Sequence, residues 1–340
     1  MSAASPADAR DVVDLGDLLG AVTSREPMAS DVGKSGACLE WVWIGGERLV
    51  VKYLDASEDW TLRAGGVPGG ASLELWRRGL LDGLPDCFDQ PIIAVARGPR
   101  VAGGPVVTAL LMTDVSASLV PVGDEPVPLA HHTQFLAHMA ALHARFWEAG
   151  PEIDIVSPTR RYLELSPSMA AAEAKRGSPQ LVPRLVAQGW PLLEQVAPVA
   201  ASIVVPLAHD PTPLVVALAS TPQTLLHANF KLDNLGVTAD ARTVIFDWET
   251  SGRGAATADL AWYLAINCRR LPQTKQDSIR AYRGYLEACG VDTEPWWDRQ
   301  LALSLLGGLV HFGWEKALGG MDDELAWWQD KAVAGARLLG

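Results

Sequence analysis

The strongest constraint on the fold is a change of sequence pattern about one third of the way along the chain. Up to residue 113, β-branched and aromatic residues occur in short runs separated by glycine, which is typical of antiparallel strands. Beyond it, apolar residues such as Phe135, Met139 and Leu142 recur at helical spacing. A strand-rich segment followed by a helix-rich one predicts an α+β protein with two lobes, residues 1–113 and 114–340.

The first segment predicts about five antiparallel strands and one inserted helix. Its clearest signal is the pair Cys38–Ile44 and Glu47–Leu54, because the two glycines between these runs are typical of a hairpin turn. Its other expected elements are a short strand near Met28–Val32, a helix at Ala71–Leu81, and strands at Ile92–Arg97 and Pro105–Met112. In the second segment, helices are expected at His132–Ala149, Ala258–Asn267, Lys275–Cys289 and across Trp296–Leu339.

Composition excludes several classes of protein. With 49% hydrophobic and 20% charged residues, the 340-residue chain has enough apolar surface for a folded core. The net charge of −12 disfavours nucleic acid or an anionic membrane as a partner. Four cysteines without a CxxC pair argue against a disulfide framework or a zinc ribbon. No signal peptide and no apolar run of ~18 residues is evident, which predicts a cytoplasmic protein without a membrane span.

The clearest chemical pattern lies between residues 224 and 249. The apolar runs 235–238 and 243–246 are expected to pair as a hairpin, which would bring Asn234 and Asp247 to the same rim. An amide oxygen and a carboxylate are hard oxygen ligands of the kind that Mg²⁺ bound to nucleotide phosphates requires. The polar positions that make up the pattern are His227, Asn229, Lys231, Asn234 and Asp247.

The spacing of these residues resembles the catalytic loop of kinases, H-R-D-x-x-x-x-N, with Asp247-Trp248-Glu249 in the place of D-F-G. The stretches LLHANFKLDNLG (225–236) and VIFDWE (244–249) look like the aminoglycoside phosphotransferase and choline kinase-like superfamily. So do Asp259-Leu-Ala and the earlier stretch LAHMAALHARFW (136–147). The resemblance implies a protein-kinase-like fold with an antiparallel β N-lobe that binds nucleotide and a helical C-lobe.

The resemblance also assigns roles to individual residues. Lys52 is similar to the lysine that contacts the α- and β-phosphates, and Glu74 to the helix glutamate that holds it. Asn234 and Asp247 would hold magnesium. His227 would support the loop, and Lys231 would lie near the transferred phosphoryl group. The backbone of Leu111, Met112 and Thr113 would bind adenine.

A further candidate for phosphate contact is the turn at Gly33-Lys34-Ser35-Gly36. Lys34 with its flanking Gly33 and Ser35 is similar to the end of a Walker A loop, but the first glycine of that motif is absent. We therefore interpret Ser35 and Gly36 as part of a β-turn beside the phosphates rather than as a P-loop.

One residue departs from the family pattern. The family has an aspartate two residues after the loop histidine, where it accepts the proton of the substrate hydroxyl, and this chain has Asn229. An amide can orient a hydroxyl but is not basic enough to deprotonate it. Loss of a general base typically costs ~10²–10⁴ in rate. A slow kinase, a kinase whose base comes from elsewhere, and a nucleotide-binding pseudokinase are all consistent with this change.

We therefore predict a phosphotransferase that uses Mg²⁺ and ATP, or another nucleoside triphosphate, to phosphorylate a hydroxyl of a small molecule. A long activation segment for a protein substrate does not fit between Glu249 and Gly254. The alternative is a catalytically impaired pseudokinase that acts as a regulator or scaffold.

Two other features have competing interpretations. The histidines at 131, 132, 138 and 143 contain no pair at i, i+4, so packing or capping is favoured over metal binding. Asp259 is either an ordinary carboxylate at a helix N-terminus or an anchor of the catalytic loop.

Overall fold

The computed structural model describes residues 10–28 and 35–339. Contacts divide the chain into two compact units. The first contains the chain up to Val120 together with Asn234–Thr250, and the second contains Pro121–Asp233 and Ser251–Gly340. Residues 234–250 belong to the first unit because their strand β10 (Thr243–Ile245) pairs in parallel with β5 (Phe88–Asp89). A lobe boundary at residue 113 itself stays a prediction.

The first unit is built on a mostly antiparallel sheet with the strand order β1-β6-β7-β4-β3-β2. Among the described residues it has six strands rather than the five expected, because a two-residue strand, Val13–Asp14, pairs in parallel with β6. The strands are β1 (Val13–Asp14), β2 (Ser24–Pro27), β3 (Cys38–Ile44), β4 (Glu47–Leu54), β6 (Ile92–Pro99) and β7 (Val106–Thr113). Of the strand expected near Met28–Val32, residues 29–32 lie outside the described residues, and the strand β2 lies just before it.

The predicted hairpin at Cys38–Leu54 is confirmed, with β3 and β4 in antiparallel register from Cys38 opposite Tyr53 to Ile44 opposite Glu47. Gly45 and Gly46 have φ of 60° and 86°. Positive φ at both central residues defines a type I′ turn, whose twist matches that of paired strands and which glycine adopts without strain.

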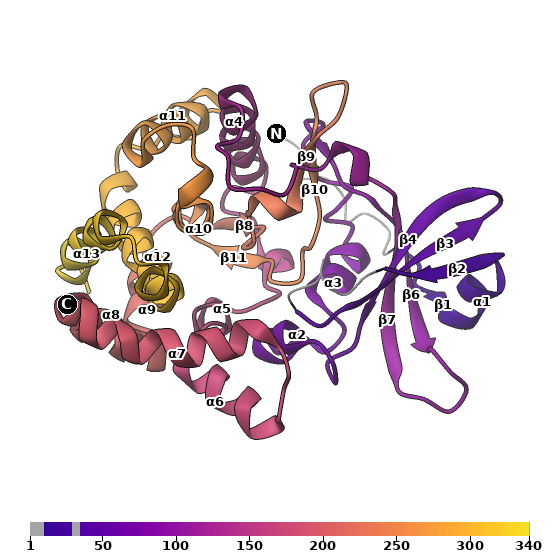
Figure 1. Cartoon of the computed structure of the whole chain (residues 1–340). Helices are drawn as coiled ribbons and strands as arrows, with labels where there is room; N and C mark the ends of the chain where they lie inside the picture. The colour runs from indigo at the N-terminus through magenta and orange to yellow at the C-terminus, as the bar shows by residue number, and fades with distance from the viewer. Residues whose placement is uncertain (1–9, 29–34, 340) are drawn as a thin grey trace. The chain divides into compact units, whose positions relative to one another are not determined.

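The side chains of β4 alternate between two differently covered faces of the sheet. Leu49, Val51 and Tyr53 are buried in a core cluster that also contains Leu15 of α1 (Leu15–Gly20). Lys52 points to the other face, since successive strand residues project on opposite sides. Figure 1 shows α1 and α3 (Ala71–Arg77) on opposite sides of these strands. Lys52 therefore lies on the face of α3.

Helix α3 is shorter than the predicted helix at Ala71–Leu81, and the described residues of this unit contain two further α-helices. It ends at Arg77, and Gly79 has φ of 65°. A residue in the left-handed region cannot continue an α-helix, and glycine is favoured there. The additional helices are α1 and α2 (Trp60–Gly65).

The second predicted hairpin is also present. Strand β9 (Leu235–Val237) pairs antiparallel with β10, with Leu235 opposite Ile245. One step further, the Phe246 N–H donates to the Asn234 carbonyl over 3.4 Å. Asn234 and Asp247 therefore lie at the same end of the hairpin, as predicted.

The second unit is mainly helical. Its longest helix, α12, runs from Trp297 to Gly319 and is buried along most of its length, with α7, α8, α10 and α13 around it (Figure 1). Gly189 of α7 permits close approach, since a Cβ there would lie 2.2 Å from the Trp314 carbonyl oxygen. The other helices are α4 (Leu129–Arg145), α5 (Pro158–Leu163), α6 (Pro167–Arg176), α7 (Leu181–Val196), α8 (Pro198–His209), α9 (Thr212–Ala219), α10 (Ala256–Ile266), α11 (Lys275–Ala288) and α13 (Asp322–Ala336). Strands β8 (Thr224–Leu226) and β11 (Gly252–Gly254) pair antiparallel within it.

Two of the histidines on α4 are buried and hydrogen-bonded, which confirms the packing interpretation for them. His132 lies 2.8 Å from the Tyr263 hydroxyl and 3.0 Å from that of Ser278. His143 contacts the Tyr282 hydroxyl at 2.7 Å. Burial lowers the pKa of His132 to about 4, because a charged imidazole is poorly solvated there.

This shifted pKa predicts an acid-sensitive fold. The folded-state pKa of His132, about 4, lies below the unfolded value of 6.5. The unfolded chain therefore binds more protons between pH 6.5 and 4, and stability falls as the pH drops through this window. The loss from this residue is expected to reach about 3 kcal/mol. Urea unfolding at pH 7 and pH 4.5 should show a smaller pH dependence for His132→Gln than for wild type. The control His131→Gln should behave as wild type, and an unchanged pH dependence in His132→Gln would contradict the assignment.

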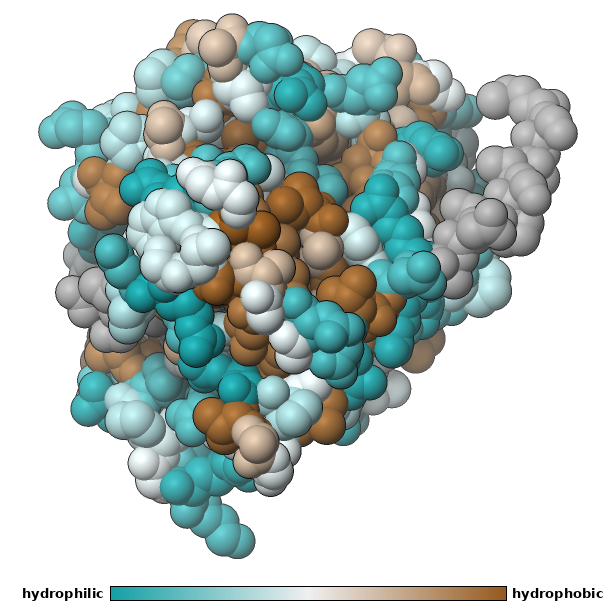
Figure 2. Space-filling model, turned by 90° about the vertical axis from the view of Figure 1, so that its right-hand side faces the viewer, coloured by the Kyte–Doolittle hydropathy of each residue, from teal (hydrophilic) through white to brown (hydrophobic). Residues whose placement is uncertain are grey.

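Among the described residues, no single helix is long and apolar enough to cross a membrane. Helices α8 and α9, which are bent by 84° relative to each other, reach that length and apolar composition only when they are counted together. Figure 2 shows one face of the molecule, on which hydrophobic residues gather near the centre among hydrophilic ones. Apolar atoms form much of any folded protein's surface, so this gathering alone identifies no partner.

Candidate active site

The first unit brings Lys52 and Asp247 together, which are 195 residues apart in sequence. The Lys52 ammonium donates to the Asp247 carboxylate over 2.5 Å, and their side chains are 11% and 23% exposed. Burial alone would lower the pKa of Lys52, but the charges of Asp247 and Glu249 outweigh it and raise that pKa above its usual value. Lys52 therefore stays charged and fixed on the sheet.

Two more carboxylates, Glu249 and Asp59, act on the same ammonium group. Both are buried, and burial raises the pKa of Glu249 to about 7 despite the opposing effect of Lys52. The charges of these two carboxylates therefore add to that of Asp247 in favouring the charged form of Lys52. Glu249 and Asp59 were not predicted, and only the position of Glu249 beside Asp247 in the sequence could have indicated it.

The predicted pair between Lys52 and Glu74 is not formed. Glu74 instead accepts from Arg77 at 3.2 Å and from Arg78 at 3.4 Å. These partners lie three and four residues further along the chain, where side chains of a helix meet. Glu74 therefore stabilises the end of α3 in this structure and does not hold the lysine.

The end of the predicted phosphate turn is tied to the same region. The Ser35 hydroxyl donates to the Asp59 carboxylate over 2.9 Å, and Gly36 follows with φ of 95°. Asp59 also accepts from the Thr61 N–H at 2.8 Å and so caps α2. The Gly33 and Lys34 portion of the turn lies outside the described residues.

The predicted adenine-binding residues lie inside the sheet. Strand β7 has β4 on one side and β6 on the other, with Leu111 opposite Val51 and Met112 opposite Val50. The Thr113 N–H donates to the Pro91 carbonyl at 3.0 Å. Adenine binding by the backbone of residues 111–113 stays a prediction, and the structure adds only that neighbouring strands already pair with this part of β7.

The catalytic-loop residues belong to the second unit, where Asp259 fixes their backbone. The buried Asp259 carboxylate accepts from the N–H groups of His227 at 2.9 Å and Ala228 at 2.8 Å. The Arg161 guanidinium donates to the Ala228 carbonyl on the other side of that residue. The interpretation of Asp259 as a loop anchor is confirmed. Asp259 also lies in the first turn of α10, where its negative charge interacts favourably with the helix dipole, but this effect is weaker than its hydrogen bonds to the loop.

The rest of the loop is held by backbone contacts. His227 is buried, and its Nδ1 accepts from the Asn229 N–H at 3.3 Å, so it supports the loop as the resemblance implied. The Lys231 N–H donates to the Asn229 carbonyl at 2.8 Å, and Leu232 donates to the Asn267 side chain at 3.0 Å. The side chains of Asn229 and Lys231 are half-buried. Asn267 was not predicted, since a single asparagine at a helix end gives no distinctive signal.

Among the described residues, four non-glycine residues have left-handed backbone conformations: Glu148, the hairpin-turn residue Ala241, and two at predicted functional positions. Ala228 has φ of 61° and Asp247 has φ of 65°. For alanine this costs roughly 1 kcal/mol, which the surrounding contacts must offset. Strained residues of this kind concentrate at functional sites. Ala228 falls in the predicted catalytic loop, and Asp247 is the predicted metal ligand.

The anchoring of the loop can be tested with Asp259→Asn. An amide keeps the size of the side chain but presents N–H groups where a backbone N–H needs an acceptor, so a buried donor loses its partner. The free energy of unfolding is expected to fall by about 3 kcal/mol in urea titrations. The exposed Asp298, in the first turn of α12, is the matched control, because Asp298→Asn removes only a helix-dipole contribution of about 0.3–1 kcal/mol. Equal losses in the two variants would contradict the anchor role.

The predicted metal ligands fit a divalent cation by their chemistry. Asn234 is 4% exposed, and it shares the hairpin end with the carboxylate of Asp247. Among the described residues, no three His, Cys, Asp or Glu side chains gather as a metal site. An ion at this hairpin would therefore depend on the amide–carboxylate pair together with phosphate and water oxygens, as is usual for Mg²⁺.

Comparison with protein families decides the membership of this chain. Residues 102–333 match the model of the phosphotransferase enzyme family, which is more than half of the sequence. The chain belongs to this family. No curated protein matches the sequence of this phosphotransferase family member.

Solved structures also resemble this family member. The choline kinase LicA from Streptococcus pneumoniae aligns with a TM-score of 0.50 at 13% identity, covering 94% of this chain and 95% of that one. It shows that the chain has the protein-kinase-like α+β fold, as predicted. Two further similar structures have TM-scores of 0.47. One is a thermostable mutant of an aminoglycoside phosphotransferase with ADP and hygromycin B, 16% identical over 95% of this chain and 97% of that one. The other is a microcompartment-associated aminopropanol kinase, 12% identical over 95% and 94%.

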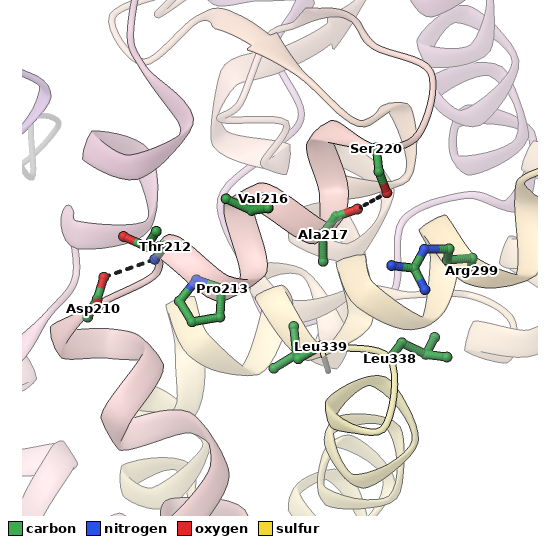
Figure 3. Close-up of a pocket in the computed structure, with 9 residues that line it drawn as sticks. All are labelled: Asp210, Thr212, Pro213, Val216, Ala217, Ser220, Arg299, Leu338 and Leu339. Atoms are coloured by element: carbon green, nitrogen blue, oxygen red, sulfur yellow. Dashed lines mark hydrogen bonds between the residues drawn. The ribbon is translucent and has the colours of Figure 1, made fainter.

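The second unit of this family member also contains a cavity of about 400 Å³ beside α9 and the start of α12. Figure 3 shows Asp210 bonded to the Thr212 N–H there and Arg299 on the opposite wall. None of the residues predicted to carry chemistry lines this cavity. It is therefore separate from the catalytic-loop residues discussed above.

Proposed function

We propose that the chain transfers a phosphoryl group from ATP, or another nucleoside triphosphate, to a hydroxyl of a small molecule with the help of Mg²⁺. Membership of the phosphotransferase family supports this reaction class. The observation that carries the proposal is the half-buried ion pair of Lys52 and Asp247, which joins the predicted phosphate-binding and metal-binding side chains within one unit. A cytoplasmic location and the lack of a nucleic-acid or membrane partner stay predictions.

Seven of the predicted residues would have distinct tasks in this reaction. Lys52 would donate to α- and β-phosphate oxygens, and Ser35 and Gly36 would lie beside them. Asn234 and Asp247 would hold Mg²⁺, which neutralises phosphate charge when bound. Lys231 would stabilise the negative charge of the transferred group, and Asn229 would orient the acceptor hydroxyl. Catalysis of this kind rests on positioning and charge neutralisation rather than on covalent chemistry.

Asn229 sets the expected rate. In the transfer, a bond forms between the acceptor oxygen and the γ-phosphorus while the bond to the leaving nucleoside diphosphate breaks. The hydroxyl proton then has to leave without a carboxylate at position 229 to accept it. We therefore expect slow turnover.

The same residue is the reason to keep a second candidate, a pseudokinase that binds nucleotide and acts as a regulator or scaffold. Lys52, Lys231, Asn234 and Asp247 are all present, however, and a chain that had lost its chemistry would be expected to lose some of them. We therefore favour the enzyme.

Thermal unfolding with nucleotide tests the proposal. Ligand at 100 times its Kd stabilises a protein by about 2.7 kcal/mol, so Mg-ATP and Mg-ADP should both raise the Tm. A panel of hydroxylated small molecules, assayed for phosphorylated product, then tests transfer. No change in Tm at millimolar nucleotide would reject both the enzyme and the nucleotide-binding pseudokinase. Nucleotide binding without transfer to any acceptor would favour the pseudokinase.

A further inference from the structure

Glu249 is a buried carboxylate that the proposed roles leave unused. It is 5% exposed, and one of its oxygens, Oε1, accepts from the Ser72 hydroxyl over 2.6 Å. The other, Oε2, is buried and has no hydrogen-bond partner among the described residues. Burying a carboxylate oxygen without a hydrogen-bond partner lowers the stability of the fold, so we expect Glu249 to have a functional role that offsets this cost.

The chain makes room for this carboxylate. A Cβ added at Gly70, which has φ of 82°, would lie 2.4 Å from Glu249 Oε2 and 2.4 Å from the Leu54 side chain. Any residue other than glycine would push Glu249 away from the start of α3. Gly70 therefore leaves the space that the Glu249 carboxylate occupies, and Ser72 fixes the carboxylate there by a hydrogen bond.

The hydrogen bond between Ser72 and Glu249 determines which side of α3 faces Glu249. Successive residues of an α-helix are 100° apart, so Ser72 and Glu74 project about 200° from each other around the axis. With Ser72 bonded to Glu249, Glu74 is directed elsewhere, and it pairs with Arg77 and Arg78. Glu74 cannot approach the surroundings of Glu249 unless α3 rotates and breaks the Ser72 bond.

Glu249 lies on the Lys52 side of the sheet. A Cβ at Gly70 would touch both Glu249 and Leu54, so these two side chains are neighbours, and Leu54 projects from the same face of β4 as Lys52. The ammonium of Lys52 donates to Asp247, and the charge of Glu249 also acts on it. Once Asp247 serves as a metal ligand, its carboxylate would be shared with the cation, and the bond that fixes Lys52 would weaken. Glu249, which has an unpartnered oxygen, could then hold the ammonium in place against the phosphates without any rotation of α3.

We propose that Glu249, and not Glu74, is the carboxylate that holds Lys52 when nucleotide and metal engage Asp247. Glu249 is then a positioning residue, because it acts on the phosphates only through Lys52. The proposal rests on the proposed function, since it assumes that nucleotide binds at Lys52.

The test compares Glu249→Gln with Glu74→Gln in the full chain. Glutamine keeps the shape and the bond from Ser72 but removes the charge. Calorimetric titration with Mg-ADP should show a Kd at least about tenfold higher for Glu249→Gln and unchanged for Glu74→Gln. A merely structural role would lower the urea midpoint and leave the Kd of the folded protein unchanged. Should Glu249→Gln fail to fold, Ser72→Ala takes its place, with an expected severalfold increase in Kd.

The possible failures are distinguishable. If the wild type does not bind Mg-ADP, the proposed function is rejected and this inference with it. If the wild type binds and Glu249→Gln, or Ser72→Ala in its place, binds equally well, the inference alone is overturned. Weaker binding by Glu74→Gln would also overturn it, because that result requires α3 to rotate and form the pair with Glu74.

Discussion

Asp247→Asn is expected to abolish the stabilisation of the protein by magnesium and nucleotide. Asparagine has nearly the same size and tolerates the left-handed backbone at this position, φ of 65°, better than most residues. The substitution therefore removes mainly the charge that a divalent cation requires. At Mg-ATP equal to 100 times the wild-type Kd, the wild type gains about 2.7 kcal/mol, and the variant should gain almost none of it.

The matched control for this variant is Asp240→Asn. Asp240 is an exposed carboxylate in the turn of the same hairpin, between β9 and β10, where it contacts Thr238 and Arg242. Its loss should leave the response to Mg-ATP as in the wild type. A full response in Asp247→Asn would contradict its assignment as a metal ligand.

Asn229→Asp is expected to accelerate phosphoryl transfer by about 10²–10⁴. The backbone at this position is already fixed, because its N–H donates to His227 and its carbonyl accepts from Lys231. A carboxylate of the same size would therefore take the place of the amide with little rearrangement and could accept the hydroxyl proton. Initial rates of both proteins should be compared over one panel of hydroxylated acceptors.

Asp233→Asn tests whether the one carboxylate present in the loop 227–234 acts as the base in place of Asn229. Asp233 is exposed, whereas the next residue, Asn234, is buried, so their side chains have different surroundings. Its loss is expected to leave the slow wild-type rate unchanged. If Asp233→Asn abolishes transfer, Asp233 is the base. If neither the wild type nor Asn229→Asp transfers phosphate, the pseudokinase is favoured.

Local patterns allowed much of the fold to be predicted. The β3–β4 hairpin follows from two β-rich runs and a Gly-Gly turn, and the β9–β10 hairpin from two apolar runs around a polar turn. Both signals are contained within about twenty neighbouring residues, where turn chemistry determines the pairing. Strand β1 was missed because two residues carry no periodicity, and its pairing with β6 joins distant parts of the chain.

The site was predictable only where sequence neighbours form it. Asn234 and Asp247 could be placed together because a hairpin connects them. The partner of Lys52 could not be placed this way, because the rotation of α3 about its axis depends on Ser72 and Gly70 contacting a glutamate some 177 residues away. A position-based match with the family therefore selected Glu74, and the structure directs Glu74 to Arg77 and Arg78.

The most direct test of the central claim is a crystal structure of the chain with Mg²⁺ and a non-hydrolysable ATP analogue. We predict that Lys52 contacts the α- and β-phosphates and that Asn234 and Asp247 bind the metal. A nucleotide bound elsewhere, or none bound at millimolar concentration, would contradict the account.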